Sequence, residues 1–158
     1  MRRAMASLAA LALLTLGCTP ADSEAQAPPQ GSKAPMANPV FHFEIPVTDM
    51  DRAIAFYETV FGHDLTRETV DGYDMAFFPR ADGQPSASGA LAKGDVYRPT
   101  HDGAVIYFDV PDIDAVIARA EARESKVLYP KKDIGAAGFV AEIEDSEGNR
   151  IALSQPKG

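Results

Sequence analysis

His42 and Glu44 are the first residues of the chain whose types and spacing could carry chemistry. They stand two positions apart where polar and apolar residues alternate, so a strand would present both side chains on one face. An imidazole beside a carboxylate can act as a general acid/base pair for proton abstraction next to a carbonyl group. Without a chemical role, His42 would be a cleft residue hydrogen-bonded to Glu44 or Tyr107.

The elements that must position this pair lie between residues 40 and 62. Apolar side chains alternate from Phe41 to Val47, which predicts a strand with one buried face. Thr48 or Asp49 offers a short side chain to cap a following helix, and Gly62 is placed to end it in a left-handed turn. The apolar stripe of this helix consists of Met50, Ala53, Ile54, Tyr57, Val60 and Phe61.

The second half of the chain repeats this pattern at a constant offset. His42 aligns with Val105 and Gly62 with Ser125, each pair 63 positions apart (105 − 42 and 125 − 62). Strand parity, cap position and helix length agree between the halves without a gap. The sequence therefore predicts two copies of a strand–helix–strand–strand–strand unit that curve around a shared cleft.

Polar residues of both halves are expected to face this cleft, because each lies on the strand face opposite the apolar one. Such a mixture suits a pocket for a small organic molecule with a few orienting polar groups. The expected lining is His42, Glu44, Tyr107, Asp109, Arg150 and Ser154, with a floor of Ala90, Val105 and Ala152.

The first 17 residues have the features of a secretory signal peptide. Arg2 and Arg3 precede an apolar run that is too short to span a membrane. The segment from Leu14 to Cys18 resembles the lipobox of bacterial lipoproteins, which implies cleavage before Cys18 and a lipid anchor on its sulfur. Residues 18–38, rich in proline, alanine, serine and glutamine, would form a flexible tether.

These features predict a lipid-anchored protein of the bacterial cell envelope. The residue after Cys18 is not aspartate, which favours the outer membrane, facing the periplasm, over the inner membrane. Two alternatives stay open. The segment could be a plain signal peptide with an incidental cysteine, or translation could start at Met36 and give a cytoplasmic protein.

Length and composition set further limits. The 158 residues provide one domain plus a tail. The net charge of −8 becomes −10 without residues 1–17, which carry two arginines and no acid. A chain this acidic is a poor partner for nucleic acid. Its single cysteine cannot form an intramolecular disulfide.

Two strings and the half-length repeat resemble the vicinal oxygen chelate (VOC) superfamily, which includes glyoxalase I, the bleomycin-resistance proteins and the extradiol dioxygenases. The strings are HFEIPVTDMDRAIAFYETVFG (42–62) and EDSEGNRIALSQP (144–156). The resemblance spans Asn38 to Pro156 and implies one α+β domain, residues 39–156. It would consist of two paired βαβββ modules, about 39–94 and 103–156. Relatives commonly pair as homodimers, so a homodimer is expected.

In metal-dependent members of this superfamily, four side chains in the cleft hold a divalent ion that polarises vicinal oxygens of the substrate. The matching positions here are His42, Ala90, Val105 and Ala152. Only the first of these is a ligand, and catalytic metal sites usually supply three or more. We therefore expect no cofactor, apart from a weakly bound divalent metal at His42 and Glu44, to which Asp109 could add a donor.

Three functions remain open. The first is a lipoprotein that binds a small organic molecule in the cleft, as the bleomycin-resistance proteins do, without a complete metal site. The second is a metal-dependent lyase or isomerase of the glyoxalase I type, for which His42 and Glu44 are the candidate catalytic residues. The third is a non-catalytic scaffold lipoprotein. The missing donors at Val105 and Ala152 favour the first.

Overall fold

The computed structural model describes residues 39–80 and 86–158. They belong to one compact unit. The first module contains β1 (His42–Val47), α1 (Met50–Phe61), β2 (Thr66–Val70), β3 (Tyr73–Phe77) and β4 (Ser88–Lys93). The second contains β5 (Tyr107–Asp109), α2 (Ile113–Glu121), β6 (Val127–Asp133), a 3₁₀ turn (Gly135–Ala137), β7 (Phe139–Glu144) and β8 (Arg150–Gln155).

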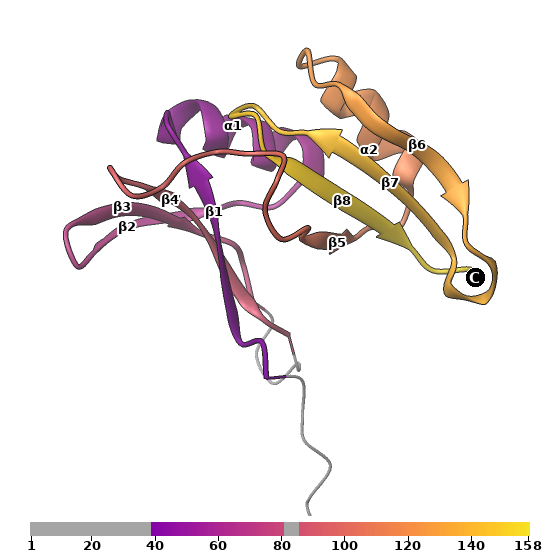
Figure 1. The fold of residues 1–158 in the computed structure, drawn as a ribbon, viewed down its shortest axis with the longest axis horizontal. Helices are drawn as coiled ribbons and strands as arrows, with labels where there is room; N and C mark the ends of the chain where they lie inside the picture. Colours follow the sequence, from indigo (N-terminus) through magenta and orange to yellow (C-terminus); the bar gives the residue numbers. More distant parts are fainter. Residues whose placement is uncertain (1–38, 81–85) are drawn as a thin grey trace, which may run out of the picture. The chain divides into compact units, whose positions relative to one another are not determined.

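Each module forms a four-stranded sheet with one helix (Figure 1). The strand orders are β1-β4-β3-β2 and β5-β8-β7-β6. In both sheets the first and last strands of the module pair in parallel, and the remaining neighbours are antiparallel. The fold is therefore α+β with two paired βαβββ modules, as the sequence predicted. Within the described residues, neither helix is long and apolar enough to cross a membrane.

The predicted helix caps are present. Asp49 has an extended backbone, and its side chain accepts a hydrogen bond from the Arg52 amide. Gly62 ends α1 in the left-handed conformation, with a φ of 74°. Asp112 caps α2 in the same way and accepts from the amides of Asp114 and Ala115.

The repeat is less regular than the sequence suggested. Helix α1 has 12 residues and α2 has 9, so the prediction of equal helix length was wrong. No glycine follows α2, and bonds from Arg123 N to Ala120 O and from Glu124 N to Glu121 O tighten its end. The left-handed residue is Glu124 (φ 65°), one position before Ser125, with which Gly62 aligns in the repeat. Strand β5 is also shorter than expected and begins only at Tyr107.

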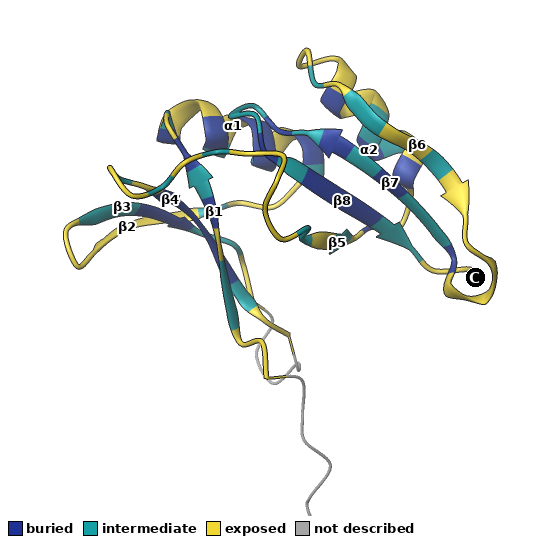
Figure 2. Cartoon of the chain, in the orientation of Figure 1, coloured by how far each residue is buried: buried dark blue, intermediate teal, exposed yellow. Residues whose placement is uncertain are grey.

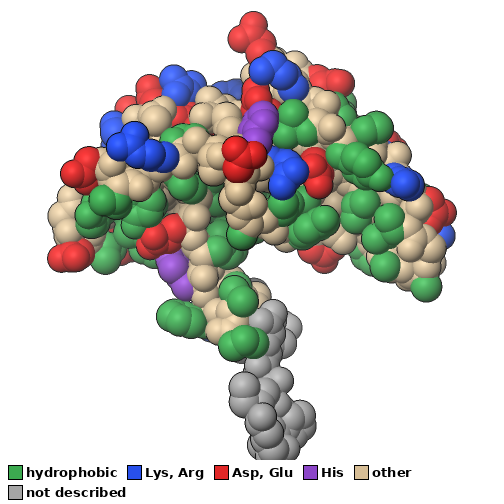
Figure 3. Space-filling model, in the orientation of Figure 1, with side chains coloured by type: hydrophobic (Ala, Val, Ile, Leu, Met, Phe, Trp, Pro, Cys, Tyr) green, Lys and Arg blue, Asp and Glu red, His purple; other side chains and the backbone are tan. Residues whose placement is uncertain are grey.

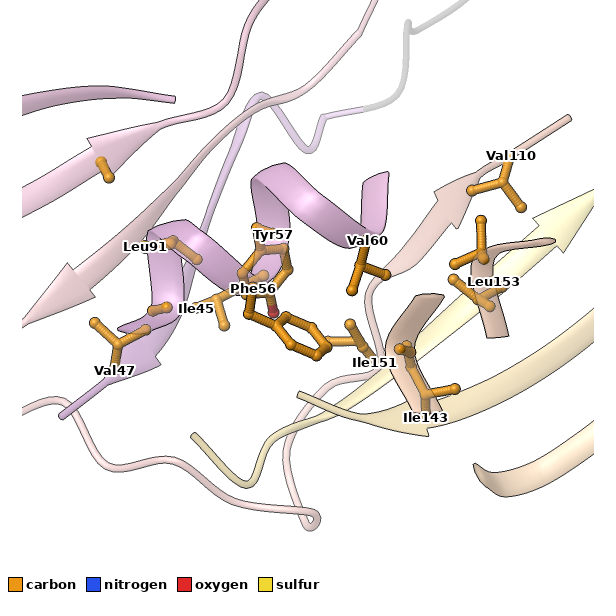
Figure 4. Packing of buried hydrophobic residues seen from close by; sticks show 14 of the residues in the cluster. Ile45, Val47, Phe56, Tyr57, Val60, Leu91, Val110, Ile143, Ile151 and Leu153 are labelled. Carbon is orange, nitrogen blue, oxygen red and sulfur yellow. The ribbon is translucent and has the colours of Figure 1, made fainter. Parts of the chain in front are cut away.

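The two modules share one hydrophobic core. Helix α1 contributes Phe56 and Tyr57, which are 1% and 0% exposed, and β8 contributes Ile151 and Leu153. Figure 4 shows the side chains of both modules gathered beside α1. Strand β8 is largely buried, whereas β2, at a sheet edge, is exposed along its whole length (Figure 2). Because the apolar faces of both sheets meet in this core, the modules form a single packed body.

Candidate functional site

A pocket of about 230 Å³ lies at the seam between the two modules, and we call it the seam pocket. Strand β1 forms one wall, the segment before β5 a second, and the beginning of β8 a third. Glu44 and Arg150 are its charged residues. The full lining is Glu44, Ile45, Pro46, Thr100, Gly103, Ala104, Ile106, Asn149, Arg150 and Ile151.

Two other hollows lie elsewhere on the described surface. The larger, about 530 Å³, is bounded by α1, the end of α2 and β7, and includes Arg52 and Arg123. The other, about 300 Å³, includes Phe43, Ser88 and Asp109. The seam pocket is the better binding candidate because it combines apolar walls with one acidic and one basic side chain.

His42 and Glu44 lie on the same face of β1, and other residues complete their cluster. His42 Nδ1 is 2.7 Å from Ser88 Oγ, and His42 Nε2 is 3.6 Å from Glu44 Oε1. The Tyr97 hydroxyl donates to Glu44 Oε2 at 2.7 Å. That hydrogen bond raises the pKa of Tyr97 to about 12, with a smaller contribution from burial. The Glu44 carboxylate therefore already has protein partners.

Ser88 and Tyr97 were not predicted as members of this cluster. Ser88 reaches His42 because the parallel pairing of β1 with β4 sets these two residues opposite each other. Tyr97 lies in the connection between the modules. Its ring packs against Met75, Ala90 and Ala92 on the sheet face opposite the main core, together with Tyr73 and Phe77. No local pattern in the sequence gives either the strand register or the path of this connection.

Arg150 brings a cation to the seam pocket. Its side chain is 36% exposed, and its Nε lies 4.0 Å from Glu142 Oε2, beyond hydrogen-bond distance. Nε is buried and has no hydrogen-bond partner in the described part of the chain. No hydrogen bond joins the remaining guanidinium nitrogens to a residue in the ranges 39–80 and 86–158 either. Within the described residues, the guanidinium N–H groups of Arg150 are therefore free of hydrogen-bond partners and suit a ligand that carries hydrogen-bond acceptors.

The remaining predicted site residues do not line the seam pocket. Tyr107 is 55% exposed and pairs with Ala152, and Asp109 pairs with Ser154 in the sheet of the second module. Asp109 instead lines the 300 Å³ hollow. Ala90 and Ala152 are fully buried. Of the predicted polar residues, the structure therefore brings Glu44 and Arg150 into one pocket and places His42 beside Glu44.

The turn between β7 and β8 joins the pocket walls, and we call residues 145–149 the closing turn. Asn149 Nδ2 donates to Pro46 O at 2.8 Å, and Asn149 Oδ1 accepts from Thr100 N at 3.0 Å. Pro46 and Thr100 both line the pocket. One side chain thus fixes β1 and the inter-module connection against the beginning of β8.

Asp145 holds the closing turn in shape. It is 4% exposed, and its carboxylate accepts hydrogen bonds from Glu147 N, from Asn149 N and Nδ2, and from the Tyr57 hydroxyl. Burial raises the pKa of Asp145 above its ordinary value, although these hydrogen bonds oppose the shift. Burial and the nearby Asp145 raise the pKa of Tyr57 well above its ordinary value. Tyr57 therefore stays protonated and donates.

Glu147 connects the closing turn to the beginning of α1. Its carboxylate accepts hydrogen bonds from Thr48 N, Thr48 Oγ1 and Asp49 N at 2.7–3.0 Å, and from Arg52 Nε at 2.8 Å. Its side chain is 0% exposed. Burial opposes ionisation, but the hydrogen bonds from Arg52, Thr48 and Asp49 outweigh it and lower the pKa of Glu147 to about 2. The second module thus supplies an anion to the helix N-terminus of the first.

A family model described as the Glyoxalase/Bleomycin resistance protein/Dioxygenase superfamily matches residues 40–153. The chain belongs to this superfamily. The match covers both modules, including β1 and the closing turn. The comparison with curated proteins gave no match.

Solved structures of the superfamily are similar to the chain. The trypanothione-dependent glyoxalase I of Leishmania major is 26% identical, with a TM-score of 0.59 over 75% of this chain and 86% of that one. TnmS3, an antibiotic-binding protein from Streptomyces sp. CB03234, is 27% identical, with a TM-score of 0.53 over 75% of this chain and 95% of that one. The fosfomycin-resistance protein FosX of Listeria monocytogenes is 16% identical over 73% of this chain and 90% of that one, with a TM-score of 0.53, and shows the fold alone.

The side chains present do not fit the metal of the metal-dependent superfamily members. Ala90 and Ala152, which the superfamily resemblance matches to two of the four ligand positions, are fully buried and carry no side-chain donor atom. Across residues 39–80 and 86–158, no three His, Cys, Asp or Glu side chains come together in a group that could hold a metal ion. His42 has Ser88 and Glu44 as neighbours, which gives at most one imidazole and one carboxylate.

Replacing Glu147 with Gln should make the stability of the protein less dependent on pH in the acid range. The carboxylate has an ordinary pKa of 4.5 and a folded-state pKa of about 2, so it stabilises the folded protein above pH 4.5 and loses this effect as the pH falls towards 2. Because Arg52 is half exposed, solvent screening limits the effect, and we expect E147Q to cost about 2 kcal/mol at pH 7. Urea unfolding at several pH values measures the difference.

The matched control is Glu121→Gln, which changes an exposed glutamate at the end of α2. Its free energy of unfolding should follow that of the wild type at every pH. A gap between wild type and E147Q that stays constant from pH 7 to pH 3 would contradict the role assigned to the Glu147 carboxylate.

Proposed function

We propose that the protein binds a small organic molecule in the seam pocket, without the complete metal site of its metal-dependent relatives. The observation that carries this proposal is that one acidic residue, Glu44, and one basic residue, Arg150, line the same pocket of about 230 Å³, whose other walls are mainly apolar. Apolar walls supply affinity through burial, and a few polar groups fix the orientation of the ligand.

Two further observations support a binding role. Three of the four positions that hold metal ligands in metal-dependent relatives carry Ala90, Val105 and Ala152. The antibiotic-binding protein TnmS3 is 27% identical to the chain, and the match covers 95% of TnmS3 and 75% of this chain. We extend small-molecule binding, without the ligand of TnmS3, to this protein.

A lyase or isomerase of the glyoxalase I type is the second candidate. It is favoured by the contact between His42 and Glu44 and by the 26% identity to the Leishmania major enzyme. Within this candidate, His42 would accept a proton next to a carbonyl group, and Glu44 would orient the imidazole. The side chains around His42 offer no second histidine or third carboxylate, so we derive no metal-dependent step.

The cellular setting is also a proposal. Cys18 and the tether of residues 18–38 lie outside the described residues, and the case for lipidation rests on the sequence pattern alone. Lipidation of Cys18 would hold the binding domain at the periplasmic face of the outer membrane. A homodimer is proposed from the superfamily resemblance. A scaffold role has its support in the exposed ring of Phe41, which is 81% exposed.

Filling the seam pocket should abolish ligand binding. Ala104 is exposed and lines the pocket, so Ala104→Trp places an indole in its mouth. We expect a thermal-shift screen of small aromatic and dicarbonyl compounds to give ligands that stabilise the wild type and not A104W. Ala87→Trp is the matched control, because Ala87 is also exposed but lines the 300 Å³ hollow. Ligands lost in A87W and kept in A104W would place the binding site elsewhere.

Purified full-length protein should carry well below one equivalent of transition metal per chain. The reason is the donor set, which provides only His42 and Glu44 where the metal-dependent relatives use four side chains. Elemental analysis after purification without chelators measures the content. One equivalent of Ni, Zn, Fe or Mn that disappears in His42→Ala would instead favour the lyase or isomerase.

Replacing Cys18 with Ser should release the protein from the membrane fraction of cells that express the full-length chain. A serine hydroxyl cannot carry the thioether-linked lipid that the Leu14–Cys18 pattern implies. Fractionation and immunoblotting measure the distribution. A C18S protein that stays with the membranes as the wild type does would exclude lipidation as the anchor.

A further inference from the structure

We infer that the ligand of the seam pocket is a small carboxylic acid with an apolar body, and that Arg150 holds its carboxylate. This inference rests on the proposed binding function and names the class of ligand. Three properties of the pocket lead to it: the unequal use of its two charged groups, its size and the composition of its walls.

The two charged groups of the pocket differ in how far the protein already satisfies them. Glu44 accepts a hydrogen bond from the Tyr97 hydroxyl and has the His42 imidazole 3.6 Å away. Arg150 has one ionic neighbour, Glu142, at 4.0 Å. Its guanidinium donates no hydrogen bond to any residue of the described ranges. The charged group of the pocket that lacks a hydrogen-bond partner among the described residues is therefore the Arg150 guanidinium, and it would bind a hydrogen-bond acceptor, preferably an anion.

A carboxylate meets that demand best. The guanidinium presents parallel N–H groups that match the two oxygens of a carboxylate, and such charge-assisted bonds are stronger than neutral ones. Arg150 Nε is itself buried, so water screens an attraction at this atom less than at a fully exposed one. Within the described residues, the one acidic neighbour of the guanidinium is Glu142, which lies 4.0 Å from Nε, beyond hydrogen-bond distance. Acidic and basic side chains are intermixed on the face that Figure 3 shows.

The pocket volume limits the body of the acid. At about 230 Å³ it is below the range of roughly 300–1,000 Å³ that is usual for drug-sized ligands. A single ring or a short chain attached to the carboxylate would fit. Pro46, Ala104 and Ile106 would offer apolar contact to such a body, whereas Ile45 and Ile151 lie behind them, almost fully buried in the core. Large peptide-like or multi-ring molecules exceed this space.

The test compares acids with their own amides, which keep the body and remove the charge. The probes are benzoate and benzamide, phenylacetate and phenylacetamide, and cinnamate and cinnamamide, titrated into the full-length protein by calorimetry at pH 7. We expect at least one acid to bind about ten- to hundredfold more tightly than its amide, as a charge-assisted hydrogen bond would give. Arg150→Gln should remove that preference and leave the affinity for the amide unchanged.

Two further variants separate recognition from damage to the fold. Arg150→Lys keeps the charge and loses the paired N–H geometry, so its preference for the acid should lie between those of wild type and R150Q. Arg123→Gln removes an exposed arginine that lines the 530 Å³ hollow and should bind as the wild type does. Melting temperatures of R150Q and R123Q equal to that of the wild type would show that neither change unfolds the domain.

The outcomes distinguish the ligand class from the binding function. If no acid binds more tightly than its amide, or if R150Q keeps the preference, the carboxylate inference is wrong. If some amides nevertheless bind and A104W blocks them, the seam pocket is a binding site for neutral molecules and the proposed function stands. If neither acids nor amides bind and the wider screen gives no ligand that A104W blocks, the proposed function fails as well.

Discussion

The structure depends on one buried contact, in which the closing turn of the second module caps the first helix of the first. Glu147 accepts five hydrogen bonds from Thr48, Asp49 and Arg52, and Asn149 Nδ2 donates across to Pro46 O. These bonds hold the polar ends of the modules together, beside the core in which their apolar faces meet. They add to the shared core, which contains Ile45 of β1 and Ile151 of β8, in setting the spacing of the two strands beside the pocket.

This contact also has a cost. Asp145 is almost fully buried, and its raised pKa shows that burial disfavours its charged form. The free-energy cost of burying this carboxylate is offset by the hydrogen bonds that it accepts from the amides of the turn and from the Tyr57 hydroxyl. Gly148 completes the turn with a φ of 91°, a backbone conformation that residues other than glycine rarely adopt. The residues of the closing turn therefore join the two modules, in addition to any part that they play in binding.

The sequence predicted the helices and strands well, and it predicted the tertiary contacts between them poorly. Alternation placed His42 and Glu44 on one face of β1, and the half-length repeat gave the paired modules, because both are properties of local spacing. Ser88 could not be found in this way, since the register of a parallel pair depends on tertiary packing. Tyr97 lies in a connection without periodicity. The EDSEGN string was identified by resemblance, and its role as the joint between modules required coordinates.

The central claim is that the seam between the modules is a binding site, and its most direct test is a map of amide chemical shifts during titration with phenylacetate. The account predicts that the largest changes fall on three stretches: residues 44–46, 100–106 and 149–151. Changes centred instead on the hollow that contains Arg52 and Arg123, or spread evenly over the surface, would contradict it.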